Sequence, residues 1–201
     1  MMNFEGAKNF ILNKLSRELD PRLAYHSVGH TLDVHDSAIR IANLEKISEP
    51  DIILLRTAAL FHDSGMLITY RGHEEASMKI MSEVLPGYNY SPEDIHRIES
   101  MIITTKLPQS ADDKLSMILC DADLDYLGRD DYFFISHKLK YEWDLLDIYP
   151  TTLKQWYELQ IKFVGSHQYF TKSSRLTRDK KKFSNLEQIR EMFENENDRV
   201  K

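Results

Sequence analysis

The sequence predicts an all-α fold of about eight helices, arranged as one compact domain over residues 1–201. Glycine and proline are scarce, with seven and six among 201 residues, roughly half of ordinary usage. So few turn-forming residues favour long helices over a many-stranded sheet. Apolar residues also recur at intervals of three and four, which is the period of a helix. The length lies below the roughly 250–300 residues at which chains usually divide into domains.

In the first half, the apolar periodicity predicts helices over residues 4–15, 30–44, 52–61, 73–85 and 91–106. The segment 52–61 is almost wholly apolar, as expected of a helix buried on all sides. We expect Gly65 to terminate that helix. Ser91 and Pro92 are typical of a helix start, with serine as the cap and proline in the first turn.

In the second half, we expect an apolar helix over 115–127 and two or three long helices over 130–193. The long helices should break near Pro150 and in the region of Ser173–Ser174. We expect the helices of 130–201 to pack on a core formed by 25–127.

Composition restricts the kind of site. With 26 basic and 32 acidic residues the net charge is −6, which argues against extended nucleic-acid binding. The single cysteine, Cys120, excludes an internal disulfide and a cysteine-rich zinc site. Any metal would therefore be held by the eight histidines and the carboxylates. There is no apolar run of about 18 residues and no signal peptide, so a cytoplasmic protein with no membrane partner is expected.

Two histidine motifs lie next to apolar helices. His26 and His30 are four apart, which on a helix would place both on one face. His62 and Asp63 directly follow the buried segment. A lone histidine near an apolar helix is more often an ordinary hydrogen-bonded residue, and we assign no role to His35, His96, His137 and His167.

A third motif sets Asp121, Asp123 and Asp125 in apolar sequence. Aspartate is rarely buried unless it is paired or binds a metal. Asp121 and Asp125 would share a helix face, and Asp123 would point elsewhere. A divalent cation held by several of these side chains would offset the cost of burying carboxylates. The four expected ligands are His30, His62, Asp63 and Asp123.

The ordered set of these ligands resembles the H…HD…D pattern of the HD-domain metal-dependent phosphohydrolases, over residues 25–127. The segment from Tyr25 to Val34 is also similar to the YHNxxHAxDV signature of the cyclic-nucleotide phosphodiesterase branch. That similarity implies His26 as the general acid and His30 as a ligand. Ala122-Asp123-Leu124 is similar to the ADL sequence of that branch, which favours Asp123 over Asp121.

The resemblance is incomplete at the second metal position. Binuclear members supply two further histidines, whereas this chain offers His73 and no histidine near 104–106. We therefore expect a single ion, or a second one held through His73 and water, with Asp121 as an alternative auxiliary group. The ion could be Mn²⁺, Mg²⁺, Fe²⁺, Co²⁺, Ni²⁺ or Zn²⁺, since these ligand types do not select one.

The expected reaction is hydrolysis of a phosphoester, with a nucleotide or cyclic nucleotide as the favoured substrate. Asp63 would bind the metal and orient the attacking water, and His26 would protonate the departing oxygen. Lys106, Lys172 and Arg175 are candidates for binding the substrate phosphate, the alternative being a solvated basic helix face. Two other functions remain open: a nucleotide-sensing module without turnover, and a helical scaffold with an incidental metal. A homodimer is compatible with the sequence.

Overall fold

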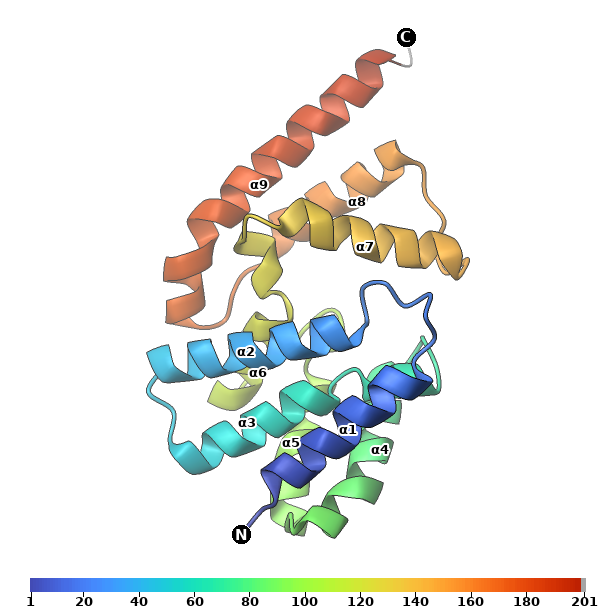
Figure 1. Cartoon of the computed structure of the whole chain (residues 1–201). Helices are drawn as coiled ribbons and strands as arrows, with labels where there is room; N and C mark the ends of the chain where they lie inside the picture. Colours follow the sequence, from blue (N-terminus) through green and yellow to red (C-terminus); the bar gives the residue numbers. More distant parts are fainter. Residues whose placement is uncertain (200–201) are drawn as a thin grey trace. The chain divides into compact units, whose positions relative to one another are not determined.

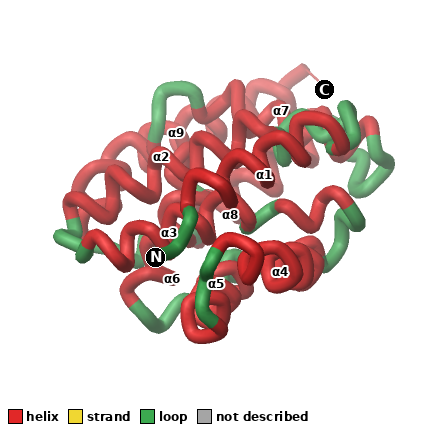
Figure 2. The backbone as a smooth tube through the Cα atoms, turned by 60° about the horizontal axis from the view of Figure 1, so that its bottom comes forward, coloured by secondary structure: helices red, strands yellow, loops and turns green. Residues whose placement is uncertain are grey.

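The computed structural model describes residues 1–199, and within this range helices joined by loops are present and there is no strand (Figure 2). The predicted all-α fold is confirmed, with nine α-helices and three short 3-10 helices in the described range. The elements are α1 (Phe4–Glu18), α2 (Val28–Leu44), α3 (Glu49–Phe61), η1 (Ser64–Leu67), α4 (His73–Val84), η2 (Leu85–Tyr88), α5 (Pro92–Ile103), α6 (Lys114–Asp123), η3 (Asp125–Gly128), α7 (Tyr132–Leu145), α8 (Leu153–Ser166) and α9 (Lys172–Arg199) (Figure 1). None of the helices described is long and apolar enough to cross a membrane.

The chain divides into two compact units, Met1–Asp123 and a second one from Leu124 onward. The first contains α1 to α6, and the second contains η3 and α7 to α9. Each unit is described by itself below. The expectation that residues 130–201 pack on the core formed by 25–127 stays a prediction.

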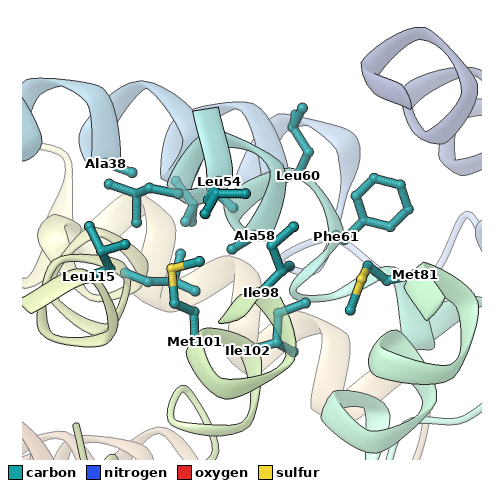
Figure 3. Packing of buried hydrophobic residues seen from close by; sticks show 14 of the residues in the cluster. Ala38, Leu54, Ala58, Leu60, Phe61, Met81, Ile98, Met101, Ile102 and Leu115 are labelled. Carbon is teal, nitrogen blue, oxygen red and sulfur yellow. The ribbon is translucent and has the colours of Figure 1, made fainter. Parts of the chain in front are cut away.

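The core of the first unit is built around α3. Leu54 and Ala58 of this helix are at most 1% exposed, and they pack in one cluster with side chains of all the other α-helices of the unit. In Figure 3 they lie among Ile98 and Met101 of α5, with Met81 of α4 on the far side of the same cluster. A helix with apolar side chains all round removes them from water only when it is buried on every side, as the sequence predicts for this segment.

Polar caps fix where the helices of the first unit begin. Ser27 caps α2, its Oγ accepting the backbone N–H of His30 at 3.4 Å. Ser91 and Asp94 form a reciprocal capping box at the start of α5, with Pro92 in the first turn. Both caps satisfy N–H groups that a helix start leaves unpaired.

The predicted helix 115–127 is wrong at its end, because α6 ends at Asp123 and a separate 3-10 helix begins at Asp125. Asp121 and Asp125 therefore do not share a helix face. Asp125 belongs to the second unit, where its oxygens accept hydrogen bonds from Nε and Nη2 of Arg178 at 2.8 and 2.9 Å. The two hydrogen bonds from Arg178 thus explain why the Asp125 carboxylate can be buried.

Two other sequence predictions need correction. Helix α3 ends at Phe61 and not at Gly65, which lies inside η1. The break expected in the region of Ser173–Ser174 falls earlier, before α9 begins at Lys172. The hydroxyl of Thr171 accepts the backbone N–H of Ser174 at 3.2 Å, so Thr171 starts the helix in the way that a capping threonine does. The break near Pro150 is confirmed, since it falls between α7 and α8.

Candidate metal centre

Four helix ends carry the predicted ligands. His30 lies in the first turn of α2, and His62 directly follows the last residue of α3. Asp63 precedes η1, and Asp123 is the last residue of α6. The buried parts of α2, α3 and α6 pack together in one cluster, so their polar ends can meet at its edge.

The side chains of these four residues converge. One ligand atom each from His30, His62 and Asp123 lies within 4.8 Å of the others. Oδ1 of Asp123 is 3.2 Å from Nε2 of His30 and 3.6 Å from Nε2 of His62. Oδ2 of Asp63 is 3.3 and 3.1 Å from the same two nitrogens. Two imidazoles and two carboxylates thus face one small volume.

Backbone carbonyls orient two histidines of the site. Nδ1 of His62 lies 2.9 Å from the carbonyl oxygen of Ala59, and Nδ1 of His73 lies 2.9 Å from that of Tyr70. A carbonyl oxygen only accepts, so each Nδ1 must donate its proton. Nε2 of the neutral ring then carries the lone pair and faces the carboxylates, which is the arrangement commonly found around metal-binding histidines.

His73 approaches the second oxygen of Asp63. Its Nε2 lies 3.3 Å from Oδ1 of Asp63, on the opposite side of the carboxylate from His30 and His62. Glu74, which the sequence reasoning missed, is buried beside it, with Oε1 3.6 Å from the same nitrogen. A glutamate at the exposed-looking start of a helix gives no sequence signal of burial, so only the fold reveals it.

The electrostatics of the site depend on these contacts. Burial alone would lower the pKa of His30, but hydrogen bonds with Asp123 and Asp63 outweigh it and raise that pKa to about 9. The pKa of His62 is raised as well, because burial is outweighed by the charge of Asp63. Conversely, burial would raise the pKa of Asp123, but its bonds to the two histidines lower it to about 2. Both carboxylates therefore stay ionised at neutral pH.

The donor set fits a divalent cation. Two neutral imidazoles and the two ionised carboxylates Asp63 and Asp123 supply nitrogen and oxygen ligands, and their charge balances that of the ion. The site is at most 16% exposed at any of these side chains, and without a cation its two carboxylates are balanced by protonation of His30 and His62, whose pKa values are raised. A divalent ion would supply the same positive charge in place of those protons. Nitrogen and oxygen donors suit several first-row metals and do not single out one.

His26 lies at the edge of the centre but outside the helix. It precedes the cap of α2, so the spacing of four between His26 and His30 does not place them on one helix face. Its ring is nevertheless close, with centroid distances of 6.1 Å to His30 and 5.6 Å to His73. The ring of Tyr70 packs edge-on against it at 5.4 Å.

The predicted auxiliary aspartate points elsewhere. Asp121 is fully buried in α6, two residues before Asp123, and a step of two residues turns a helix by about 200°. It is absent from the group of converging ligand atoms. Gln109, in the loop between α5 and α6, instead contacts Asp123: its Nε2 lies 3.4 Å from Oδ2. The sequence reasoning missed this glutamine because the contact depends on the course of a loop.

The predicted phosphate-binding cations fall in different places. Lys106 lies in the same loop as Gln109 and pairs with Glu75 in the first turn of α4, where His73 also lies. Lys172 and Arg175 are exposed residues of α9 in the second unit, and their part in substrate binding stays a prediction.

Part of this chain is similar to known proteins. A family model described as "HD domain" matches residues 27–125, the segment that contains all four predicted ligands. A protein of Clostridium beijerinckii described as "Uncharacterized protein" is 33% identical over 89 residues, which is 43% of this chain and 56% of that protein. The chain thus matches little more than half the length of this relative. No solved structure matches the chain significantly.

Proposed function

Residues 27–125 of the chain belong to the HD domain superfamily of metal-dependent phosphohydrolases, and from this premise we propose that the protein hydrolyses a phosphoester by attack of water at a metal centre. The observation that supports the proposal is the convergence of His30, His62 and Asp123, with Asp63 at 3.1 Å from His62. The four side chains that match the superfamily's H…HD…D pattern thus lie together, which supports the proposal.

Each residue has a distinct part in this proposal. His30, His62, Asp63 and Asp123 hold the ion, which when bound supplies Lewis acidity and a water that is acidic near neutral pH. Asp63, whose second oxygen faces His73, accepts a hydrogen bond from the attacking water and so orients it. His73 fixes that carboxylate and could take part in holding a second ion through Oδ1 of Asp63.

His26 is proposed as the general acid. It lies next to the expected ligands, with its ring centroid 6.1 Å from that of His30 and 5.6 Å from that of His73. An imidazole can carry a proton near pH 7 and give it to the departing oxygen. A positioned acid of this kind contributes typically about 10²–10⁴-fold to the rate.

The substrate class is proposed to be a nucleotide or cyclic nucleotide. The similarity of the Tyr25–Val34 segment to the cyclic-nucleotide phosphodiesterase signature supports it. Lys106, paired with an exposed carboxylate beside the α4 start, is the proposed phosphate-binding cation in the first unit. An exposed ion pair is worth only about 0–1 kcal/mol, so a phosphate dianion can compete for this lysine.

A substrate panel tests the proposal. Purified protein with added Mn²⁺ is expected to hydrolyse an aryl phosphodiester or members of a panel of nucleotides and cyclic nucleotides, and Asp63→Ala should abolish turnover. His26→Ala should keep the metal and lose about 10²–10⁴-fold in rate. His96→Ala is the matched control, since its side chain is 81% exposed on α5. Bound metal without turnover on the whole panel would favour the nucleotide-sensing module instead.

A further inference from the structure

The loop between α5 and α6 lies against the helix that carries Asp123. Near its start, Sγ of Cys120 lies 3.2 Å from the carbonyl oxygen of Thr104. Further along, Nε2 of Gln109 lies 3.2 Å from the carbonyl oxygen of Cys120. These contacts attach two points of the loop to the last turn of α6.

Gln109 makes a second contact from the same nitrogen. Its Nε2 lies 3.4 Å from Oδ2 of Asp123, whereas Oδ1 of that carboxylate faces His30 at 3.2 Å. A side-chain amide NH₂ has two protons, so it can serve both acceptors at once. Both acceptors, a carbonyl and a carboxylate ionised at neutral pH, lack a proton to give, and this fixes which end of the amide faces them.

We propose that Gln109 is a positioning residue for Asp123, which holds Oδ2 against the α6 terminus so that Oδ1 is presented to the metal centre. This inference rests on the proposed metal-binding function of the site. A carboxylate at the end of a helix can rotate about two side-chain bonds, and a donor on one oxygen restricts that rotation. A side chain that hydrogen-bonds to a metal-binding residue typically contributes about 10- to 100-fold to metal affinity.

The contact between Gln109 and Asp123 is long for a hydrogen bond. At 3.4 Å it is longer than an optimal N–H···O bond of about 2.9–3.0 Å, so on its own it adds little to folding stability. Its effect is expected in the orientation of the carboxylate, and the second bond to the Cys120 carbonyl keeps the amide in place. The side chain of Gln109 is itself half-buried, which limits competition from water.

The test measures metal affinity, by competition of Mn²⁺ between the protein and a chelator. Gln109→Ala should weaken Mn²⁺ binding about 10- to 100-fold, while the unfolding midpoint of the chelator-treated protein stays that of the wild type. Gln109→Glu, which has the same shape but offers no proton to either acceptor at neutral pH, should fail to restore the wild-type metal site. Ser110→Ala, an exposed neighbour in the same loop, is the matched control.

A double-mutant cycle separates positioning from a general structural effect. In an Asp123→Ala background, Gln109→Ala should change Mn²⁺ affinity by less than about twofold, because the residue acts only through the missing carboxylate. The visible spectrum of bound Co²⁺ gives a second readout, and it should change in the Gln109→Ala single variant.

The outcomes are distinguishable. If wild-type protein binds no metal, the proposed function fails. If wild-type protein binds Mn²⁺ and Gln109→Ala binds it equally well with an unchanged Co²⁺ spectrum, the positioning role is overturned. An equal loss of Mn²⁺ affinity on Gln109→Ala in the wild-type and Asp123→Ala backgrounds would also overturn it, because the effect would then not depend on Asp123.

Discussion

Asp63 and His73 face each other at 3.3 Å, measured from Oδ1 of the carboxylate to Nε2 of the imidazole. The other oxygen of Asp63 lies 3.1 Å from Nε2 of His62. The carboxylate of Asp63 therefore lies between His62, one of the predicted ligands, and His73 at the start of α4. Replacing His62 and replacing His73 should therefore affect metal binding differently.

His62→Ala is expected to remove the primary metal, whereas His73→Ala should keep it. His62 is fully enclosed by the ligand cluster, and its loss removes one of the few nitrogen donors there. His73 approaches the site through Oδ1 of Asp63, the oxygen that faces away from His30 and His62, so its loss should mainly weaken any second ion. Elemental analysis of both purified variants measures this, and loss of all metal from His73→Ala would show that His73 belongs to the primary site.

Protein stripped of metal by a chelator is expected to lose stability as the pH rises from about 6.5 to about 9. The folded-state pKa values of His30 and His73 are raised to about 9, mainly through the neighbouring carboxylates. Their contribution to stability is therefore fully present below the unfolded value of about 6.5 and is lost as the pH passes through the folded one.

Metal binding has the opposite dependence on pH. The ion competes with protons for the histidine nitrogens, so affinity should increase over the same interval. Denaturant titrations at several pH values, with and without Mn²⁺, measure both effects.

At the acid end, the pKa of Asp123 is lowered to about 2. The contribution of Asp123 to stability is therefore present above about 3.8 and is lost as the pH falls through about 2. Stability of stripped protein that does not change between pH 6.5 and 9 would contradict the described charge state.

Gly65→Ala is expected to destabilise the protein by about 1–3 kcal/mol, as overpacked sites usually do. A Cβ at this position would lie 2.0 Å from the backbone oxygen of His73 and 2.7 Å from the backbone nitrogen of Ser77. The backbone N–H of Gly65 also donates to the Ser77 hydroxyl at 2.7 Å, so this hydrogen bond would break if η1 and α4 moved apart.

Gly87→Ala provides the matched control for this prediction. A Cβ there meets no atom within 4 Å, and the change in stability should stay within about 0.5 kcal/mol. Denaturant unfolding of the two variants decides the matter. Equal stability of Gly65→Ala and wild type would mean that η1 and α4 are not in close contact.

The Cys120 thiol is expected to resist modification in the folded protein. Burial raises its pKa to about 12, and only the thiolate reacts readily. At pH 8 an aromatic disulfide reagent should react slowly with native protein and at once after denaturation. A native thiol that reacts as fast as a free cysteine would show that the α6 terminus opens easily.

The sequence was sufficient to predict the helical class and which histidine and aspartate side chains converge. His30, His62 and Asp123 could be found because each joins a metal-binding side chain to the end of an apolar helix, and helix ends pack at the edge of a shared core. The capping sequence Ser91-Pro92 likewise marked the start of α5, since capping is a local interaction.

Features that depend on contacts between distant segments could not be read in the same way. Gln109 and Glu74 have no distinctive sequence context, and their position follows from how a loop and a helix start fold around Asp123 and His73. Asp125 was expected on one helix face with Asp121, and its actual partner, Arg178, is 53 residues away in the chain. Gly65 looked like a helix terminator, although close approach of two backbones explains it better.

The most direct test of the account is a Mn²⁺ titration of chelator-treated protein in which bound metal and phosphodiester hydrolysis are recorded on the same sample. The account predicts that hydrolysis is absent without metal, rises in proportion to the metal bound and is lost in Asp63→Ala. Hydrolysis that is unaffected by the chelator, or full metal occupancy with no hydrolysis of any phosphoester in the panel, would contradict it.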